Sequence, residues 1–340
     1  MPDQIEPAFL LLLGYSAADS KFRGYERGDR GYMIINTGAR TDIPAFFSTW
    51  FLNRIKEGFV YVRNPYYKEQ VTRYKLTPDV VDCLIFCTKN PRPILSRIHE
   101  LDAFASYWFL TITPYGREIE PNAPPVDQVI HDFQILSKEL GCHRVCWRYD
   151  PIFINERYTV DCHMEEFSEM AKNLSGYTDE CVISFIDLYE KTKRNFPGIR
   201  EVSTEEQIQI AQRFSEIGKQ FGITVKTCAE AGNLCQYGIQ PSGCITQAVM
   251  ENAIGVNLKN IRRKPNRSNC GCIPNRDIGA YNTCPHGCKY CYANYNQETV
   301  KRNVRMHDPK SPLLIGRPGK GDIIHDALQE SYVDLQQTLL

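Results

Sequence analysis

The chain has 340 residues, of which 42% are hydrophobic and 24% are charged, and this composition is typical of a globular protein rather than a disordered one. Its 40 basic and 40 acidic residues give a formal net charge of zero, which does not favour long-range attraction to nucleic acid or to an acidic membrane. The length is sufficient for one large α/β barrel or for two smaller domains.

Short runs rich in β-branched and aromatic residues predict strands, and amphipathic stretches between them predict helices. The strands are expected at residues 31–36, 59–62, 81–87, 107–113, 144–149, 181–187 and 223–228. Several of them are almost continuously apolar, as expected for strands that are buried on both faces of a sheet. The helices are expected at residues 43–56, 93–101, 126–140, 164–174 and 204–221.

Two of these helices carry start signals in the sequence. Asp42 is a candidate N-cap with Pro44 close behind it, and Ser203 with Glu206 forms a candidate capping box. Repeated strand–helix units imply a parallel sheet with right-handed crossovers. About seven units before residue 228 favour a TIM-like (β/α) barrel, and an open doubly wound sheet is the alternative.

Polar residues follow several of the predicted strands, where the active site of a (β/α) barrel lies. Ordinary turn chemistry explains any one of them equally well. The catalytic candidates at these strand ends are Lys89, Arg148, Asp150, Tyr189 and Lys226.

The strand–helix pattern breaks after residue 228, and this break suggests a division of the chain. We expect an N-terminal extension at 1–30, a barrel body at 31–228, a cysteine-containing insertion at 229–276, a cysteine loop with its helix at 277–306, and a C-terminal tail at 307–340. The insertion includes a predicted helix at 245–252 and a basic cluster of Arg262, Arg263, Lys264 and Arg267.

The fourteen cysteines are unevenly distributed, since eight of them lie in the last third of the chain. The apolar run at 9–13 is too short to span a membrane, and the acidic residues before it are unlike the start of a signal peptide. We therefore expect a reducing cytoplasm, in which clustered cysteines bind metal. The six earlier cysteines are expected to act as small buried hydrophobic residues.

The strongest signal is a C-x3-C-x2-C motif formed by Cys284, Cys288 and Cys291, called the triad below. Three thiolates at this spacing can bind three irons of a [4Fe-4S] cluster and leave the fourth iron open. A helix predicted at 293–302 would point its N-terminal amides at such an anionic cluster. A zinc site that uses His286 or another cysteine, or thiols without a metal, are the alternatives.

These residues resemble those of the radical S-adenosylmethionine (SAM) enzymes, and the run from Cys284 to Ala293 is especially similar to the spore photoproduct lyase-like branch. The chain as a whole resembles the family called domain of unknown function 1848, from about Arg40 to Asn294. The matching segments are Arg40-Thr-Asp-Ile-Pro44, Thr88-Lys-Asn-Pro91, Trp147-Arg-Tyr-Asp-Pro-Ile152 and Asp277-Ile-Gly-Ala-Tyr281.

The resemblance implies an enzyme that binds SAM at the open iron and cleaves it to a 5′-deoxyadenosyl radical, which attacks a small-molecule or peptide substrate. It implies a [4Fe-4S] cluster and SAM as cofactors, and a reductant such as flavodoxin or ferredoxin as a partner. Most radical SAM barrels carry the cluster loop after their first strand. Residues 277–281 would then form that strand, in a barrel that is partial and circularly permuted.

Under this hypothesis five residues lie at the cofactor. Gly38, Arg40 and Asp42 are expected near the amino or carboxylate group of SAM, and Tyr290 and Tyr292 are the motif residues expected beside it.

A second metal site is expected from Cys228, Cys244, Cys270 and Cys272, called the four-cysteine group below. These four thiolates are expected to hold an auxiliary [4Fe-4S] cluster, with a structural zinc ion and scattered free thiols as the alternatives, and Cys235 is the spare ligand.

Two other functions remain open. One is a nucleic-acid lesion enzyme like spore photoproduct lyase, which the neutral charge balance does not favour. The other is a non-enzymatic iron–sulfur protein that carries electrons or senses redox state.

Overall fold

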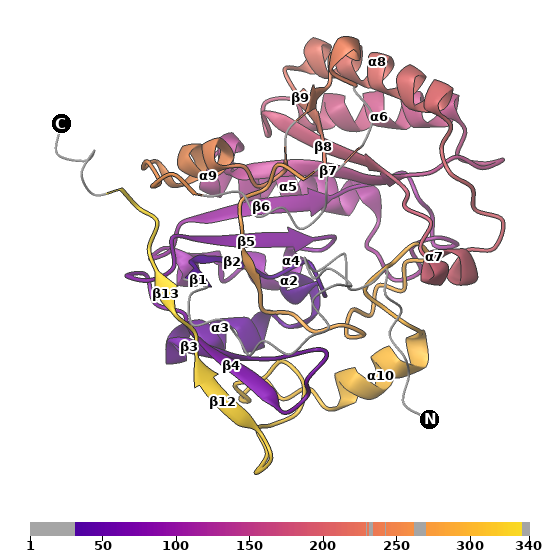
Figure 1. Cartoon of the computed structure of the whole chain (residues 1–340). Coiled ribbons are helices and arrows are strands. Elements are labelled where there is room, and N and C mark those ends of the chain that lie inside the picture. Colours follow the sequence, from indigo (N-terminus) through magenta and orange to yellow (C-terminus); the bar gives the residue numbers. More distant parts are fainter. Residues whose placement is uncertain (1–30, 229, 231–233, 242, 262–269, 335–340) are drawn as a thin grey trace.

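The structure is a computed structural model that describes residues 31–228, 230, 234–241, 243–261 and 270–334. Its main element is an eight-stranded parallel sheet with the strand order β10-β9-β8-β7-β6-β5-β2-β11 (Figure 1). The strands are β2 (Ile34–Asn36), β5 (Cys83–Thr88), β6 (Ser106–Thr111), β7 (Val145–Ile152), β8 (Glu180–Phe185), β9 (Thr224–Thr227), β10 (Gln240–Pro241) and β11 (Arg276–Asp277).

The predicted parallel α/β architecture is confirmed in this sheet. The strand order puts β10 and β11 at its two edges, and no pairing in the described part of the chain joins them. Closure into a barrel therefore stays a prediction. The predicted N-terminal extension at 1–30 and the basic cluster at 262–267 lie outside the described residues.

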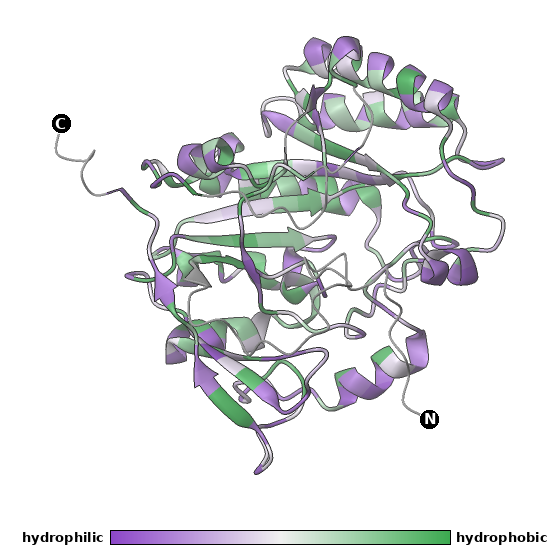
Figure 2. Ribbon diagram, viewed as in Figure 1, coloured by the Kyte–Doolittle hydropathy of each residue, from purple (hydrophilic) through white to green (hydrophobic). Residues whose placement is uncertain are grey.

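One face of the sheet packs against the helices. These are α2 (Ile43–Phe46), α3 (Ser48–Glu57), α4 (Arg92–Leu95), α5 (Val126–Leu140), α6 (Val160–Leu174) and α8 (Thr204–Phe221). Alternate strand residues point to this face, because side chains alternate along a strand. Trp147 of β7 stacks on Phe167 of α6 at 4.6 Å between ring centroids, and Phe167 stacks on Phe214 of α8 at 3.7 Å. The strands are correspondingly apolar in Figure 2.

The other face of the sheet is covered by the segment between β10 and β11. Ile85, Phe109 and Val182 point to this face and lie in one buried cluster with Met250 of α9 (Gln247–Ile254). Cys244 and Cys272 belong to the same cluster. The predicted insertion is therefore part of the core of the protein.

The C-terminal segment forms a second, smaller sheet with the order β12-β4-β3 (Figure 1). It contains β3 (Phe59–Arg63), β4 (Gln70–Lys75) and β12 (Ile323–Asp326), and β1 (Gly31–Tyr32) pairs separately with β13 (Gln329–Glu330). The prediction that residues 59–62 form a unit of the main sheet is wrong, because β3 turns back to pair antiparallel with β4. The described part of the expected tail, residues 307–334, packs on the rest of the protein, since the Ser311 carbonyl oxygen accepts a hydrogen bond from the buried Trp50 indole at 2.9 Å.

The helices predicted at 126–140 and 204–221 are found with the same bounds, and the capping box of Ser203 and Glu206 is confirmed. The helix predicted at 43–56 begins after Asp42 as expected but breaks at Phe47, whose φ and ψ of −132° and 22° are not helical. The segment predicted at 93–101 is divided into α4 and a 3₁₀ helix, η2 (Ile98–Leu101).

The helix after the triad, α10 (Gln297–Arg305), starts later than the predicted residue 293. The Asn296 side chain caps it by accepting from the Thr299 amide at 2.8 Å. The residues before Asn296 are held in another way, since the Asn294 side chain donates to the Cys284 carbonyl oxygen at 2.7 Å. The expected amide contact with the triad is therefore made by residues before the helix, since the Ala293 and Asn294 amides interact with the Cys291 thiol.

The remaining elements are α7 (Glu190–Asn195), η3 (Cys142–Arg144) and η4 (Leu234–Tyr237). Within the described residues, none of the helices has both the length and the apolar character needed to cross a bilayer.

Substitution Phe214→Ala should lower the stability of the protein strongly. Phe214 is fully buried and ends the aromatic stack from β7 to α8, so its loss leaves a cavity that costs about 3–5 kcal/mol. The matched control is Ile135→Ala on α5, whose side chain is 37% exposed and should change stability by less than about 0.5 kcal/mol. The midpoint of urea unfolding measures both, and equal midpoints for the two variants would contradict this packing.

Candidate metal centre

The loop that carries the triad leaves the sheet next to the first strand of the main sheet. β11 pairs in parallel with β2, and the Ile278 amide donates to the Asn36 carbonyl oxygen at 2.9 Å. Because the strands run in one direction, the loops after β11, β2, β5 and β6 all leave from the carboxyl edge of the sheet. The triad therefore lies at the edge where the sequence predicted functional residues.

Asp277, at the end of β11, binds the turn that follows β2. Its Oδ2 accepts from the Ala39 amide at 2.7 Å, and its Oδ1 accepts from Arg40 Nε at 2.7 Å. Arg40 also donates to the Asp277 carbonyl oxygen. Burial lowers the pKa of the Arg40 guanidinium, but the Asp277 carboxylate outweighs burial and leaves that pKa above its ordinary value. The pair fixes Arg40 as a cation beside the triad loop.

Asp42 connects three segments at the same edge. Its carboxylate accepts from the Ala45 amide at 3.0 Å, from the Lys89 amide at 2.9 Å and from His286 Nε2 at 2.9 Å. The other ring nitrogen of His286 contacts the Asn122 carbonyl oxygen at 3.3 Å. Both nitrogens of His286 are thus occupied within the protein, which argues against a zinc site that uses this histidine.

A buried ion pair supports the middle of the triad loop. Lys89 Nζ lies 2.9 Å from Glu120 Oε1, and the Tyr290 and Thr113 hydroxyls donate to the same carboxylate oxygen. Burial raises the pKa of the nearby Cys288 thiol, and Glu120 raises it further, whereas Lys89 acts in the opposite direction. Lys89 and Tyr290, predicted as catalytic and cofactor residues respectively, are held together by Glu120.

The three thiols of the triad are half-buried, and burial raises the pKa of each of them. For Cys291 the amides of Ala293 and Asn294 act in the opposite direction, as do Lys191 and Lys89. Amide donors and cations stabilise a thiolate, which is the form that binds metal.

Gly38 and Tyr292, two other predicted cofactor residues, connect the segment after β2 to β5 and to the triad loop. A Cβ atom at Gly38 would lie 2.3 Å from the Cβ atom of Cys87, so only glycine fits this position beside β5. The Tyr292 hydroxyl donates to the Ala39 carbonyl oxygen at 2.6 Å. All five predicted cofactor residues therefore lie on the triad loop or on the turn that contacts it.

The fold brings three members of the four-cysteine group together, and the fourth, Cys270, lies beside the backbone of Cys272. Cys244 Sγ lies 3.5 Å from Cys228 Sγ and 3.5 Å from Cys272 Sγ, and the Cys272 amide lies 3.5 Å from Cys270 Sγ. Among the residues that the structure describes, Cys228, Cys244 and Cys272 form the one group of potential metal ligands whose ligand atoms all lie within 4.8 Å of one another. The spare ligand, Cys235, is exposed and is not a member.

Arg148 lies between this group and the end of β7. Its guanidinium donates to Asp150 and, at 3.6 Å, to Cys87 Sγ, and the Ser184 hydroxyl donates to Asp150. Burial lowers the pKa of Arg148, but Asp150 and the thiols of Cys87, Cys244 and Cys228 together outweigh it and raise that pKa. Two predicted catalytic residues, Arg148 and Asp150, are therefore in direct contact.

The other two catalytic candidates lie apart from this pair. Lys226 is paired with the carboxylate of Glu180, the first residue of β8, and so points to the amino edge of the sheet. Tyr189 donates to Asp187 at 3.0 Å at the start of α7. The structure thus brings together Arg148 and Asp150 and leaves Lys226 at the opposite edge.

Sequence reasoning missed Glu120, and it gave the side chains of Asp277 and Glu230 no specific role. Burial raises the pKa of Glu230 to about 7, and its carboxylate accepts from the Phe185 amide at 2.9 Å. Glu120 is an isolated acidic residue outside any recognisable spacing, whereas Asp277 directly before the triad loop and Glu230 after the predicted strand at 223–228 had a positional signal.

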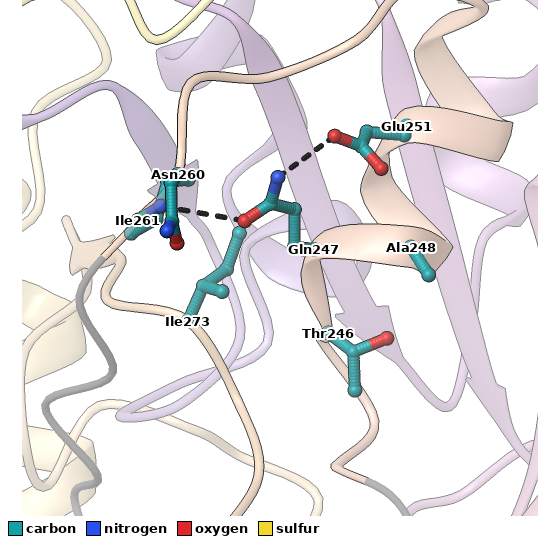
Figure 3. A pocket seen from close by; sticks show the side chains of 7 residues that line it. All are labelled: Thr246, Gln247, Ala248, Glu251, Asn260, Ile261 and Ile273. Carbon is teal, nitrogen blue, oxygen red and sulfur yellow. Dashed lines mark hydrogen bonds between the residues drawn. The ribbon is translucent and has the colours of Figure 1, made fainter.

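A pocket of about 650 Å³ lies along α9 (Figure 3). Its polar side chains are used within the protein, since Gln247 donates to Glu251 at 2.8 Å and accepts from the Ile261 amide at 3.3 Å. None of the residues that line it is a cysteine. Its hydrogen bonds fix the loop after α9 rather than mark a reactive site.

Comparison with curated proteins finds no match. Among solved structures the chain is similar to the endo-fucoidan hydrolase MfFcnA4 from glycoside hydrolase family 107, with 10% sequence identity and a TM-score of 0.23. That match covers 60% of this chain and 33% of the hydrolase, so the chain spans about a third of the length of that enzyme. A TM-score this low carries no argument about fold or activity.

The comparison with protein families gives a match over residues 34–293, from β2 to the end of the triad loop. The matched region is more than half of the chain. The chain therefore belongs to the family described as Domain of unknown function (DUF1848).

Proposed function

We propose that this protein is a radical SAM enzyme in which the triad holds a [4Fe-4S] cluster. The observation that carries the proposal is the position of the triad, on a loop that leaves the carboxyl edge of a parallel sheet directly after β11. Ligands of open α/β sheets bind at this edge, so a cofactor on this loop faces the residues that follow the other strands.

The residues around the triad fit such a cluster. The motif offers three soft thiol ligands, while both ring nitrogens of its histidine are occupied by Asp42 and Asn122. Lys89 and Lys191 offset negative charge near these thiols. When bound, the cluster and SAM supply a 5′-deoxyadenosyl radical that abstracts hydrogen from the substrate.

The turn after β2 is the proposed contact for SAM. Arg40 carries a fixed positive charge beside the triad loop, and Asp277 sets its direction. Gly38 leaves this turn without a side chain where it meets β5. Asp42 acts as a positioning residue, since its carboxylate already joins α2, β5 and His286.

Arg148, Asp150 and Ser184 are the proposed substrate contacts, because they lie at the carboxyl ends of β7 and β8. A paired guanidinium and carboxylate suit a small molecule or peptide that carries polar groups. The electron comes from a separate reductant such as flavodoxin or ferredoxin.

The order of the strands supports a permuted barrel. If β11 is counted first, the order β11-β2-β5-β6-β7-β8-β9-β10 follows the chain from one edge of the sheet to the other. The strand before the triad is then the first strand of a partial (β/α) barrel, although it is the last of these eight strands in the sequence.

Anaerobic reconstitution, reduction with dithionite and addition of SAM should yield 5′-deoxyadenosine from the wild-type protein. Cys288→Ala should abolish this product and remove about four irons per chain, because two thiols do not retain the cluster. The matched control is Cys235→Ala, an exposed cysteine outside both cysteine groups. If SAM neither yields the product nor changes the electron paramagnetic resonance signal of the wild type, the protein is an iron–sulfur carrier or sensor instead.

Arg40→Ala should weaken SAM binding at least about tenfold, which corresponds to about 1.4 kcal/mol. The iron content should stay at the wild-type level, because Arg40 contacts Asp277 and not the triad. Equilibrium binding of SAM to the reconstituted protein measures the effect. Arg213→Ala is the control, since Arg213 forms an exposed ion pair with Glu216 on α8. If Arg40→Ala and Arg213→Ala bind SAM with equal affinity, Arg40 is not part of the SAM site.

A further inference from the structure

We propose that the four-cysteine group binds a single tetrahedral zinc-class metal ion at a site separate from the triad. The sequence predicted an auxiliary [4Fe-4S] cluster here, with zinc or free thiols as alternatives, and the arrangement of the sulfur atoms favours zinc instead.

The distances between the sulfur atoms suit a mononuclear site. Tetrahedral zinc with Zn–S bonds of about 2.3 Å places its ligand sulfurs about 3.8 Å apart. The thiolates of a [4Fe-4S] cubane are much wider apart, at about 6 Å, because each binds a different iron. The distances from Cys244 Sγ to Cys228 Sγ and to Cys272 Sγ are both 3.5 Å, close to the zinc value.

The triad provides a comparison within the same chain. In the described residues Cys228, Cys244 and Cys272 are a group whose three sulfurs all lie within 4.8 Å of one another, and the triad is not such a group. Cys270 is outside this limit and would complete the site as its fourth ligand, from its place beside the Cys272 amide. The two sets of cysteines therefore have different spacings, the wider one at the proposed cubane and the narrower one here.

The backbone around the four-cysteine group brings its sulfur atoms together and donates hydrogen bonds to them. The Ile245 amide donates to Cys272 Sγ at 3.2 Å, and the Cys272 amide lies 3.5 Å from Cys270 Sγ. Amide donors of this kind orient metal-bound thiolates and stabilise their charge. A Cβ atom at Gly243 would lie 2.4 Å from the Cys272 amide nitrogen, so glycine is needed for the close approach of the two loops.

The site joins three distant parts of the fold. Cys228 follows β9, Cys244 precedes α9, and Cys270 with Cys272 precedes β11. Arg148 interacts electrostatically with Cys244 and Cys228 and offsets part of the negative charge that four thiolates leave on a divalent ion. The metal would thus fasten the segment around α9 to the sheet and not act on a substrate.

Metal analysis of the full-length protein, produced with both zinc and iron available, tests the proposal. We expect about one zinc per chain besides the iron of the triad. Cys272→Ser should lose the zinc and keep the iron, whereas Cys288→Ala should lose iron and keep the zinc. Cys235→Ser, an exposed cysteine near the group, should change neither metal.

Cobalt substitution gives a second measurement that needs no variant. Cobalt in the wild-type protein should show the intense thiolate charge-transfer absorption and the visible bands of a tetrahedral four-sulfur site. Removal of zinc with a chelator should lower the thermal midpoint, and zinc should restore it.

Three results would overturn the proposal. Loss of about four irons in Cys272→Ser would assign an auxiliary cubane. Disulfides within the four-cysteine group of the purified protein would show that two of its cysteines form an oxidised pair. Unchanged metal content in Cys272→Ser would show that the group consists of packed thiols without a metal. None of these outcomes bears on the product formed from SAM at the triad, so the two proposals fail independently.

Discussion

The position of the triad depends on a two-residue parallel pairing between segments that are far apart in the chain. Asp277 of β11 accepts hydrogen bonds from Ala39 and Arg40. Arg40 and Asp277 are 237 residues apart in the chain. Without the pairing of β11 with β2 the loop that carries the triad has no fixed place at the carboxyl edge of the sheet. Bringing together two segments that are so far apart in the chain costs conformational entropy. One short strand pair offsets this cost only together with buried charged groups.

The buried charges provide that support and also fix the geometry of the loop. Lys89 and Glu120 are both almost fully buried, and Glu120 also accepts from Tyr290 within the motif. Such a pair adds little net stability, but removal of one partner costs about 3–5 kcal/mol because the other charge remains buried. Asp42 and His286 form a second buried polar contact, at 2.9 Å between Oδ2 and Nε2. The loop is held by polar contacts of defined direction, which suits a site that must present three sulfurs in one arrangement.

Much of this fold could be predicted from the sequence, because local patterns determine it. α5 and α8 have strong helical periodicity, and α8 has a capping box. The position of β3 could not be predicted, because an apolar strand has the same pattern whether it joins a parallel sheet or an antiparallel pair. Membership of the four-cysteine group was predictable from the clustering of cysteines, but the spacing of its sulfurs depends on how β9, α9 and β11 meet. The direction of Lys226 was missed because strand position alone does not say which edge a long side chain reaches.

The late position of β11, the triad and β12 in the chain affects the order in which parts of the protein can fold during synthesis. β2 and β5 to β9 come earlier in the chain, whereas β11, the triad and β12 follow them and leave the ribosome later. Domains begin to fold from the N-terminus during synthesis, so most of the central sheet is complete before its last edge strand exists. β12 then pairs with β4, whose partner β3 was already in place. The thiols of both cysteine groups are thus completed late, when the sheet they dock against has already formed.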